Sequence, residues 1–325
     1  SNYRKIDLPK GAIERYVPTE PEKMGILLKE ILAEENIYTL RASILFSTQA
    51  SFVRVVDIPS DLTLVQAHEY VANPSSPLQL PIPIHQTDFD LNATSLTSKN
   101  KSQEYRKYLL TSIPRKSVDA MLNTLVAAGL DIATAEISYN CQLRLIANYI
   151  SVLEQNEYIV ILELLSDYTQ VILADSSGPI AVERITAIRD YPSLTKTFDQ
   201  NGSKSSKDVN SGGSEAEKYM PLSDLDLKVL IRECLKVVKS AFREHKLSGH
   251  ISFYLSGENS AHPNITKLIG RVLKMPVNLL SPINSIGVGE FDFDPVLASE
   301  YSFGGLIGLG LGLMDNSELI KNKKQ

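Results

Sequence analysis

Hydrophobic and polar positions follow two different periods along this chain, and together they predict a mixture of helices and strands. Apolar side chains that recur every three or four residues indicate amphipathic helices, whereas short runs rich in β-branched and aromatic residues indicate strands. This order of elements is typical of an α/β protein. Helices are expected at residues 22–33, 115–128, 135–149, 225–245 and 265–273. Strands are expected at residues 42–46, 52–58, 105–112, 158–165, 169–174, 180–188, 251–256 and 276–280, with a hairpin turn at 175–179.

Two polar stretches interrupt the pattern. Residues 196–218 read KTFDQNGSKSSKDVNSGGSEAEK, in which Phe198 is the only large apolar side chain. Such a segment cannot bury enough surface to offset its ordering entropy, so we expect a long mobile loop there. Residues 92–103 are also polar, and we expect them to form a surface excursion between strands.

The most apolar run, residues 303–314, reads FGGLIGLGLGLM and contains five glycines. It is shorter than the ~20 apolar residues of a membrane span. Because each glycine weakens a helix by about 1 kcal/mol relative to alanine, so many glycines need a packing reason. We expect a buried segment pressed against another backbone, with a re-entrant membrane segment as the alternative. The polar tail 315–325 is expected to be solvated.

Composition and charge narrow the class of protein. The chain has 325 residues, with 33 Lys and Arg against 38 Asp and Glu, and this length suggests about two domains. The net charge of -5 argues against a dedicated nucleic-acid-binding protein. No metal site is expected, because the five His share no metal-ligand spacing, and Cys141 and Cys234 fit buried thiols in a reducing compartment. The chain begins at Ser1 rather than Met, which suggests a processed or truncated chain.

Familiar catalytic motifs are absent from the sequence. It contains no P-loop, no G-x-G-x-x-G, no H-E-x-x-H and no G-x-S-x-G motif. Residues 253–260, FYLSGENS, instead indicate a strand, a tight turn and the start of a helix. The small Ser256 and Gly257 would let a ligand approach the backbone, and the helix N-terminus would favour an anionic or polar group. The alternative is an ordinary strand-to-helix turn.

Several collinear tracts resemble one known family. Residues 251–282, ISFYLSGENSAHPNITKLIGRVLKMPVNLLSP, look like the adenosine-motif region of actin-like ATPases. The version they resemble is that of the PilM-like proteins of type IV pilus assembly, which are related to the cell-division protein FtsA. The resemblance extends to LPKGAI (8–13), LPIPIHQTDFDL (80–91), YLLTSIPRKSVDAMLNTLVAAGL (108–130) and the Gly-rich residues 300–314.

The fold and domain limits follow from this resemblance. It implies an α/β protein with an actin-like (RNase H-like) two-domain fold and an inserted small α+β subdomain. The first half is expected at residues 1–157, with the inserted subdomain at about 42–137. The second half is expected at 158–299, with the mobile loop at 196–218. Residues 300–325 are expected to form a C-terminal helix that returns to the first half, followed by a polar tail.

The phosphate-binding motifs depart from the family's pattern. The family's first phosphate hairpin lies upstream of LPKGAI and is expected to be missing from this chain. The second normally reads D-I-G-x-x-x-T, whereas residues 163–169 read ELLSDYT, with Leu165 at the glycine position and Asp167 adding negative charge. The resemblance therefore implies a pseudo-ATPase that requires no cofactor, with ATP binding left open. The degenerate nucleotide site would consist of Glu163, Ser166, Thr169, Arg232, Ser256, Gly257, Glu258 and Asn259, although a solvated helix position is favoured for Arg232.

The function implied by the resemblance is that of a binding protein. PilM-like proteins hold the cytoplasmic N-terminal peptide of PilN, an inner-membrane protein. The chain is therefore expected to be a cytoplasmic scaffold of the pilus assembly platform, peripheral to the inner membrane. Other platform proteins and a second copy of the chain are further expected partners, and nucleic acid is not. An actin-like ATPase, either kinase-like or filament-forming like FtsA, is the alternative.

The resemblance, rather than residue spacing, implies a peptide groove, and residues 58–91 are expected to form much of it. A short peptide can add main-chain hydrogen bonds and seat its side chains in apolar pockets. The same side chains could instead form the hydrophobic core of the small subdomain. For most of them, a place in this core is favoured over a place in the groove. The candidates are Leu62, Leu64, Tyr70, Leu80, Ile82 and Ile84.

Overall fold

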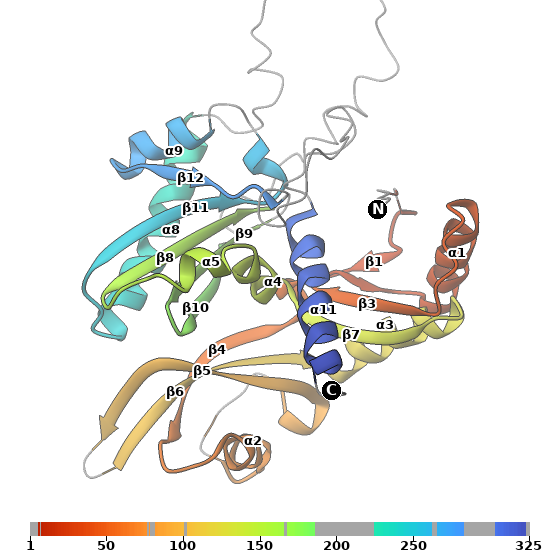
Figure 1. The fold of residues 1–325 in the computed structure, drawn as a ribbon, viewed down its shortest axis with the longest axis horizontal. Helices are drawn as coiled ribbons and strands as arrows, with labels where there is room; N and C mark the ends of the chain where they lie inside the picture. Colours follow the sequence, from red (N-terminus) through yellow and green to blue (C-terminus); the bar gives the residue numbers. More distant parts are fainter. Residues whose placement is uncertain are drawn as a thin grey trace, which may run out of the picture. The chain divides into compact units, whose positions relative to one another are not determined.

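The computed structural model describes residues 6, 8–76, 78, 82–100, 103–165, 168–185, 224–261, 265–282 and 303–322. Helices and strands alternate along these residues, and the expected α/β class is confirmed (Figure 1). The chain divides into two compact units, which are described separately. Unit 1 is Ser1–Cys141 with Gly312–Gln325, and unit 2 is Gln142–Leu311. The sequence placed the boundary between the halves later in the chain, at residue 157, and the expected mobile loop 196–218 lies outside the described residues.

Unit 2 contains a five-stranded sheet with the order β10-β9-β8-β11-β12. β8, β9 and β10 pair as an antiparallel meander, and β11 and β12 add to β8 in parallel. In chain order the strands therefore lie third, second, first, fourth and fifth across the sheet. The strands are β8 (Glu157–Leu164), β9 (Thr169–Asp175), β10 (Gly178–Ile185), β11 (His250–Ser256) and β12 (Val277–Leu279).

The central strands of this sheet are apolar because both of their faces are covered. In β8 every residue after Glu157 is buried, and β9 is buried as far as Ala174. Near-continuous apolar runs are typical of strands that lie in the middle of a sheet with two covered faces. Glu163 is the charged exception inside β8, with 4% of its surface exposed. The helices and the 3-10 turn of this unit are α5 (Ala147–Ile150), α8 (Asp224–Glu244), η3 (Glu258–Ala261) and α9 (Ile265–Leu273).

Two helices carry the chain between the units. α4 (Ser138–Leu145) begins in unit 1 and ends in unit 2, and α11 (Gly304–Asn322) runs from unit 2 back to unit 1. α11 holds the Gly-rich run, and its first glycine lies against a side chain of α4. A Cβ at Gly304 would lie 3.2 Å from Gln142 Nε2. No helix in the described part of the chain combines the length and apolar character that a bilayer crossing requires.

Unit 1 combines a parallel strand pair with a separate antiparallel sheet. β3 and β7 are parallel, whereas β4, β6 and β5 form a three-stranded antiparallel sheet inserted between β3 and α3. The elements are β1 (Ile13–Glu14), β2 (Val17–Pro18), α1 (Pro21–Glu34), β3 (Arg41–Phe46), η1 (Thr48–Ala50), β4 (Phe52–Pro59), α2 (Leu64–Ala72), η2 (Ile84–Gln86), β5 (Thr87–Asn100), β6 (Gln103–Pro114), α3 (Arg115–Ala127) and β7 (Asp131–Ile137).

The inserted sheet has its own hydrophobic core beneath α2. Its fully buried members include Ile58, Ala67 and Leu110, each with no exposed surface. A capping box at Thr63 and Gln66 starts α2, because the Thr63 hydroxyl accepts from the Gln66 N–H while the Gln66 side chain accepts from the Thr63 N–H. This core therefore makes the insertion a small α+β subdomain.

Two predictions about secondary structure were wrong. Residues 92–100 are not a surface excursion, because they continue β5 and pair with β6, for example Ser98 with Tyr105. Polar composition hid this strand, although the buried Thr94 hydroxyl donates to Lys107 O at 2.8 Å. Residues 135–149 are not one helix, because 135–137 belong to β7 and Ile146 separates α4 from α5.

Candidate functional site

A buried polar cluster lies at the end of β8 in unit 2. Glu163 Oε1 accepts a hydrogen bond from Gln142 Nε2 at 2.6 Å, and Glu163 Oε2 accepts one from Gln170 Nε2 at 2.8 Å. The Ser256 hydroxyl donates to Gln142 Oε1 at 2.8 Å. All four side chains are at least 96% buried, since their exposed fractions do not exceed 4%. We call these four residues the Glu163 cluster.

Strand register brings the Glu163 cluster together. Glu163 pairs with Gln170 across the antiparallel β8–β9 ladder and with Ser256 across the parallel β8–β11 ladder. Residues directly opposite one another in neighbouring strands present their side chains on the same face of the sheet. Gln142 reaches this face from α4, and the missing Cβ of Gly304 leaves room for its amide. The sequence named Glu163 and Ser256 but missed Gln142 and Gln170, which are polar residues within apolar stretches.

The Glu163 carboxyl is shifted toward its neutral form. Burial raises its pKa from 4.5 to about 7, although the hydrogen bond from Gln142 acts in the opposite direction. Burial dominates because the charged form loses its hydration. Both protonation states of Glu163 are therefore populated near neutral pH.

The turn at Gly257 packs closely against the backbone of Leu164. Gly257 has a φ of +87°, and a Cβ there would lie 2.6 Å from Leu164 O. Asn259 Nδ2 donates to Leu165 O at 2.9 Å, and the Ser260 hydroxyl donates to Gly257 O at 2.6 Å. The glycine that the sequence associated with a closely approaching ligand thus accommodates the end of β8.

These contacts test whether a magnesium nucleotide fits at Glu163. Both carboxylate oxygens already accept hydrogen bonds from amides, and the group is buried, so the residues described here do not fit a phosphate-bound cation at this point. Thr169 Oγ1 and Asn259 Oδ1 are buried and have no hydrogen-bond partner among the described residues. Arg232 is exposed on α8 and Glu258 is half-buried, whereas Ser166 lies outside the described residues.

The apolar side chains predicted for the peptide groove occupy different places. Leu62, Tyr70 and Ile84 pack against the core of the inserted subdomain. Leu64 is 53% exposed at the start of α2, and Leu80 lies outside the described residues. Ile82 lines a pocket. Among the described groove candidates, Ile82 is therefore the residue that lines a pocket in unit 1.

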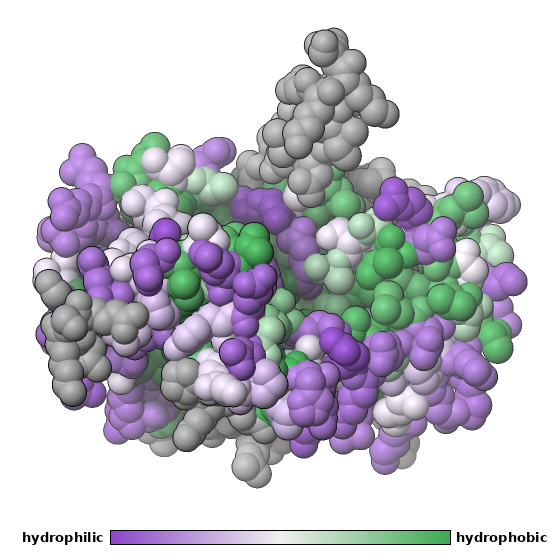
Figure 2. Space-filling model, turned by 90° about the horizontal axis from the view of Figure 1, so that it is seen from below, coloured by the Kyte–Doolittle hydropathy of each residue, from purple (hydrophilic) through white to green (hydrophobic). Residues whose placement is uncertain are grey.

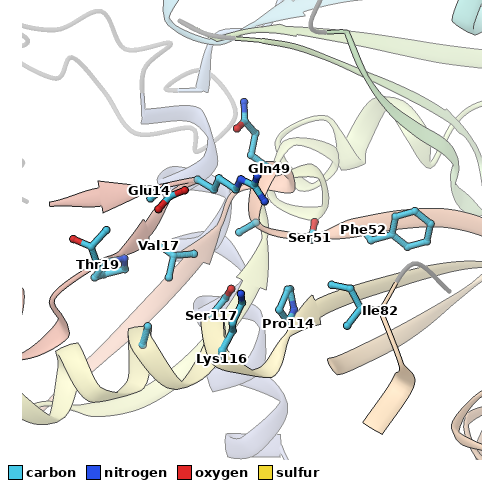
Figure 3. Close-up of a pocket in the computed structure, with 14 residues that line it drawn as sticks. Glu14, Val17, Thr19, Gln49, Ser51, Phe52, Ile82, Pro114, Lys116 and Ser117 are labelled. Atoms are coloured by element: carbon cyan, nitrogen blue, oxygen red, sulfur yellow. The ribbon is translucent and has the colours of Figure 1, made fainter. Parts of the chain in front are cut away.

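This pocket of unit 1 has a volume of about 600 Å³ (Figure 3). Four segments that are far apart in the sequence form its wall: the β1–β2 hairpin, η1 with the start of β4, Ile82, and the start of α3. The lining residues are Glu14, Arg15, Val17, Pro18, Thr19, Gln49, Ala50, Ser51, Phe52, Ile82, Pro114, Lys116, Ser117 and Ala120.

The pocket wall is held in place by local backbone geometry. Arg15 and Tyr16 both have positive φ, 49° and 64°, as the two central residues of a type I′ hairpin turn require. Pro114 ends β6 and immediately precedes α3, where its side chain makes no capping hydrogen bond. The sequence located the helix after Pro114. The start of α3 and the β1–β2 hairpin come together through long-range packing. Hydrophobic periodicity, which reports local structure, could not predict this contact.

Unit 1 also exposes apolar side chains outside the pocket. Figure 1 shows α1, β3, α3 and β7 at the right of the view. Figure 2 shows apolar surface on the same side of the molecule. Tyr38, Leu40 and Val126 are 88%, 78% and 72% exposed. Within the described residues, no three His, Cys, Asp or Glu side chains are grouped to bind a metal ion.

No protein-family model matches the chain, and no curated protein matches it either. It is similar to a chain of a solved "PilM-PilN type IV pilus biogenesis complex", with 17% identity, a TM-score of 0.69, and coverage of 94% of this chain and 88% of that one. The two chains share a fold. The actin-like (RNase H-like) fold with an inserted subdomain, expected from the sequence, is therefore confirmed.

Weaker similarities connect the chain to other solved structures. MreB 5 of Spiroplasma citri bound to AMPPNP shows 12% identity and a TM-score of 0.46, covering 96% of this chain and 80% of that chain. The ethanolamine utilization protein EutJ from Carboxydothermus hydrogenoformans shows 11% identity and a TM-score of 0.37, covering 60% and 61%. Both scores fall well below that of the PilM-PilN complex.

Proposed function

We propose that this protein is a PilM-like scaffold of type IV pilus assembly that binds a short cytoplasmic peptide of a PilN-like inner-membrane protein. The observation that carries this proposal is the pocket of unit 1, in a chain that shares the fold of a PilM-PilN complex. The protein would act on the cytoplasmic side of the inner membrane, held there by its partner. It would need no membrane segment of its own for this role.

The pocket has the size and lining that a peptide segment requires. Its volume of about 600 Å³ lies within the range of roughly 300–1,000 Å³ that is typical of sites for small ligands. Val17, Phe52, Ile82 and Ala120 supply apolar surface, which can receive one or two apolar side chains. The hairpin and the start of α3 add polar groups that can fix the direction of the peptide.

We also propose that the protein works without hydrolysing ATP. The Glu163 carboxylate, which corresponds to the catalytic-motif acid by resemblance, is buried between two amide donors. Water and a metal ion need access to such a group before phosphoryl transfer can occur. The internal hydrogen bonds support a structural role for Glu163.

Nucleotide binding without hydrolysis is the second candidate function. It is favoured by Thr169 Oγ1 and Asn259 Oδ1, two buried oxygens with no partner among the described residues. A bound adenosine or phosphate group would supply such partners. A titration of ATP with magnesium, followed by calorimetry, separates the two candidates: heat from ATP and none from the peptide would favour the nucleotide-binding protein.

The first test of the peptide proposal fills the pocket. In Ala120→Phe the added ring occupies pocket volume, so we expect affinity for a synthetic PilN-like N-terminal peptide to fall by roughly tenfold or more. Isothermal titration calorimetry measures the change. Val126→Phe on the same helix is the matched control, because Val126 is 72% exposed and does not line the pocket. Equal affinities for both variants would place the peptide elsewhere.

A further inference from the structure

We propose that the pocket of unit 1 contains an anion subsite at the start of α3, which receives an acidic side chain of the bound peptide. This inference rests on the proposed function and specifies the chemistry of its ligand. The subsite consists of the first turn of α3, the Ser117 hydroxyl and the Lys116 ammonium group. The ligand would therefore be an apolar peptide that carries a carboxylate.

The start of α3 offers unpaired backbone donors to the pocket. α3 has 13 residues, and its N-cap residue is Pro114, whose side chain makes no capping hydrogen bond. The first N–H groups of a helix have no partner within the helix, and the helix dipole places partial positive charge at this end. Lys116 and Ser117, in the first turn, both line the pocket. An anion in the pocket would satisfy donors that the chain itself leaves open.

Ser117 supplies a second and independent indication of a ligand. Its exposed fraction is 8%, so the residue is more than nine-tenths buried. Its hydroxyl has no hydrogen-bond partner among the residues that the structure describes, whereas Thr124 in the same helix donates to Ala120 O at 2.8 Å. Figure 3 shows the Ser117 hydroxyl and the Lys116 side chain pointing into the pocket. The Ser117 hydroxyl lines the pocket rather than the closed core, so a ligand in the pocket can complete its hydrogen bond.

The charges that line the pocket favour a carboxylate at this end. Arg15 and Lys116 are positive and Glu14 is negative, so the lining has an excess of positive charge. Glu14 lies in β1, on the hairpin wall, whereas Lys116 and Ser117 lie on the helix wall. A peptide carboxylate would therefore meet the cationic helix wall. Val17, Phe52 and Ile82 would contact the apolar residues beside it.

The test compares two peptides that differ only in charge. Two acetylated apolar octapeptides, one with a central glutamate and one with glutamine at the same place, are titrated into the full chain. We expect the glutamine peptide to bind roughly tenfold more weakly, because it loses a charge-assisted hydrogen bond. Lys116→Ala and Ser117→Ala should weaken the glutamate peptide about tenfold and about threefold, and change the glutamine peptide by less than about twofold. Lys29→Ala, an exposed lysine of α1, should change neither affinity.

A small carboxylate separates failure of the subsite from failure of the proposed function. Propionate at millimolar concentrations should shift the amide NMR signals of Lys116 and Ser117 in the wild-type chain, and the shift should vanish in Ser117→Ala. If neither peptide binds but propionate produces this shift, the subsite stands and the peptide function is overturned. Equal affinities for both peptides, or no shift at 116–117 with propionate, would overturn the subsite. Circular dichroism of each variant confirms that it is folded.

Discussion

The Glu163 cluster of unit 2 and the pocket of unit 1 surround their polar side chains differently. In unit 2 the Glu163 cluster is buried, and its carboxylate, amides and hydroxyl bond to one another. In unit 1 the side chains of Lys116 and Ser117 line the pocket, and the start of α3 lacks a capping side chain. Polar groups that satisfy one another hold a fold together, whereas polar groups left open in a cavity are available to a ligand.

Both sites lie after corresponding strands of the two units. In unit 1 the chain runs α1, β3, α3 and β7, with β3 and β7 parallel; in unit 2 it runs α8, β11, α9 and β12, with β11 and β12 parallel. The Gly257 turn follows β11, and the pocket residues Gln49–Phe52 follow β3. Ligands of open α/β sheets commonly bind at the carboxyl ends of such strands.

The inserted subdomain accounts for the difference between the two sites. After β11 the chain turns directly into η3, so the site closes on Leu164. After β3 the chain enters the insertion at Phe52 and leaves it at Pro114, and both of these residues line the pocket. The insertion therefore leaves a pocket after β3 in unit 1. At the corresponding place after β11 in unit 2, a tight turn leaves no such space.

The largest predicted effect tests whether the Gly257 turn is closed. Gly257→Ala should lower the free energy of unfolding by about 3 kcal/mol or more, because a Cβ would meet Leu164 O at 2.6 Å in addition to the strain of a positive φ. Urea unfolding followed by fluorescence or circular dichroism measures the loss. Gly11→Ala is the matched control, since Gly11 has a φ of +82° and nothing within 4 Å of the added Cβ. Its cost should be about 1 kcal/mol, and equal losses would mean that the turn has space for a ligand.

The second prediction concerns the pH dependence of stability in unit 2. The folded state keeps the Glu163 proton up to about pH 7, whereas the unfolded chain releases it near 4.5. The contribution of this group to stability is therefore largest below pH 4.5, falls as pH rises toward 7, and is about 3 kcal/mol smaller above that range.

Glu163→Gln removes this titration, so the unfolding free energy of the variant should decline less than that of the wild type between pH 4.5 and 7.5. Unfolding curves at several pH values measure the slope. Glu154→Gln changes an exposed carboxylate of the same unit and should leave the wild-type slope intact. A Glu163→Gln profile parallel to that of the wild type would show that Glu163 is charged and reached by solvent.

The sequence predicted unit 2 better than unit 1, and the reason is physical. β8, β9, β11, α8 and α9 have strong apolar patterns that local residues determine, so their limits were close to those expected. β5 was missed because its stability comes from pairing with β6 rather than from its polar composition. The pocket was missed because it requires Arg15, Ser51, Pro114 and Ser117 to converge from distant segments. Glu163 was found by resemblance to a motif, but its amide partners depend on strand register.

The smallest predicted effect compares two buried serines. Ser256→Ala should destabilise the protein by about 1–2 kcal/mol, because Gln142 Oε1 loses its donor inside the Glu163 cluster. Ser117→Ala should change stability by less than about 0.5 kcal/mol, because its hydroxyl has no partner to lose among the described residues. Thermal unfolding of both variants measures the difference. A large loss in Ser117→Ala would assign this serine a structural role.

The central claim is that unit 1 binds a ligand at its pocket while the Glu163 cluster of unit 2 serves the fold. Hydrogen exchange measured by mass spectrometry tests both halves at once, with a PilN-like peptide and with magnesium ATP added separately. We predict that the peptide slows exchange at residues 14–19, 49–52 and 116–120, and that magnesium ATP changes nothing at 163–165, 168–170 and 256–260. Protection of the unit 2 segments by ATP, with none of the unit 1 segments protected by the peptide, would contradict the account.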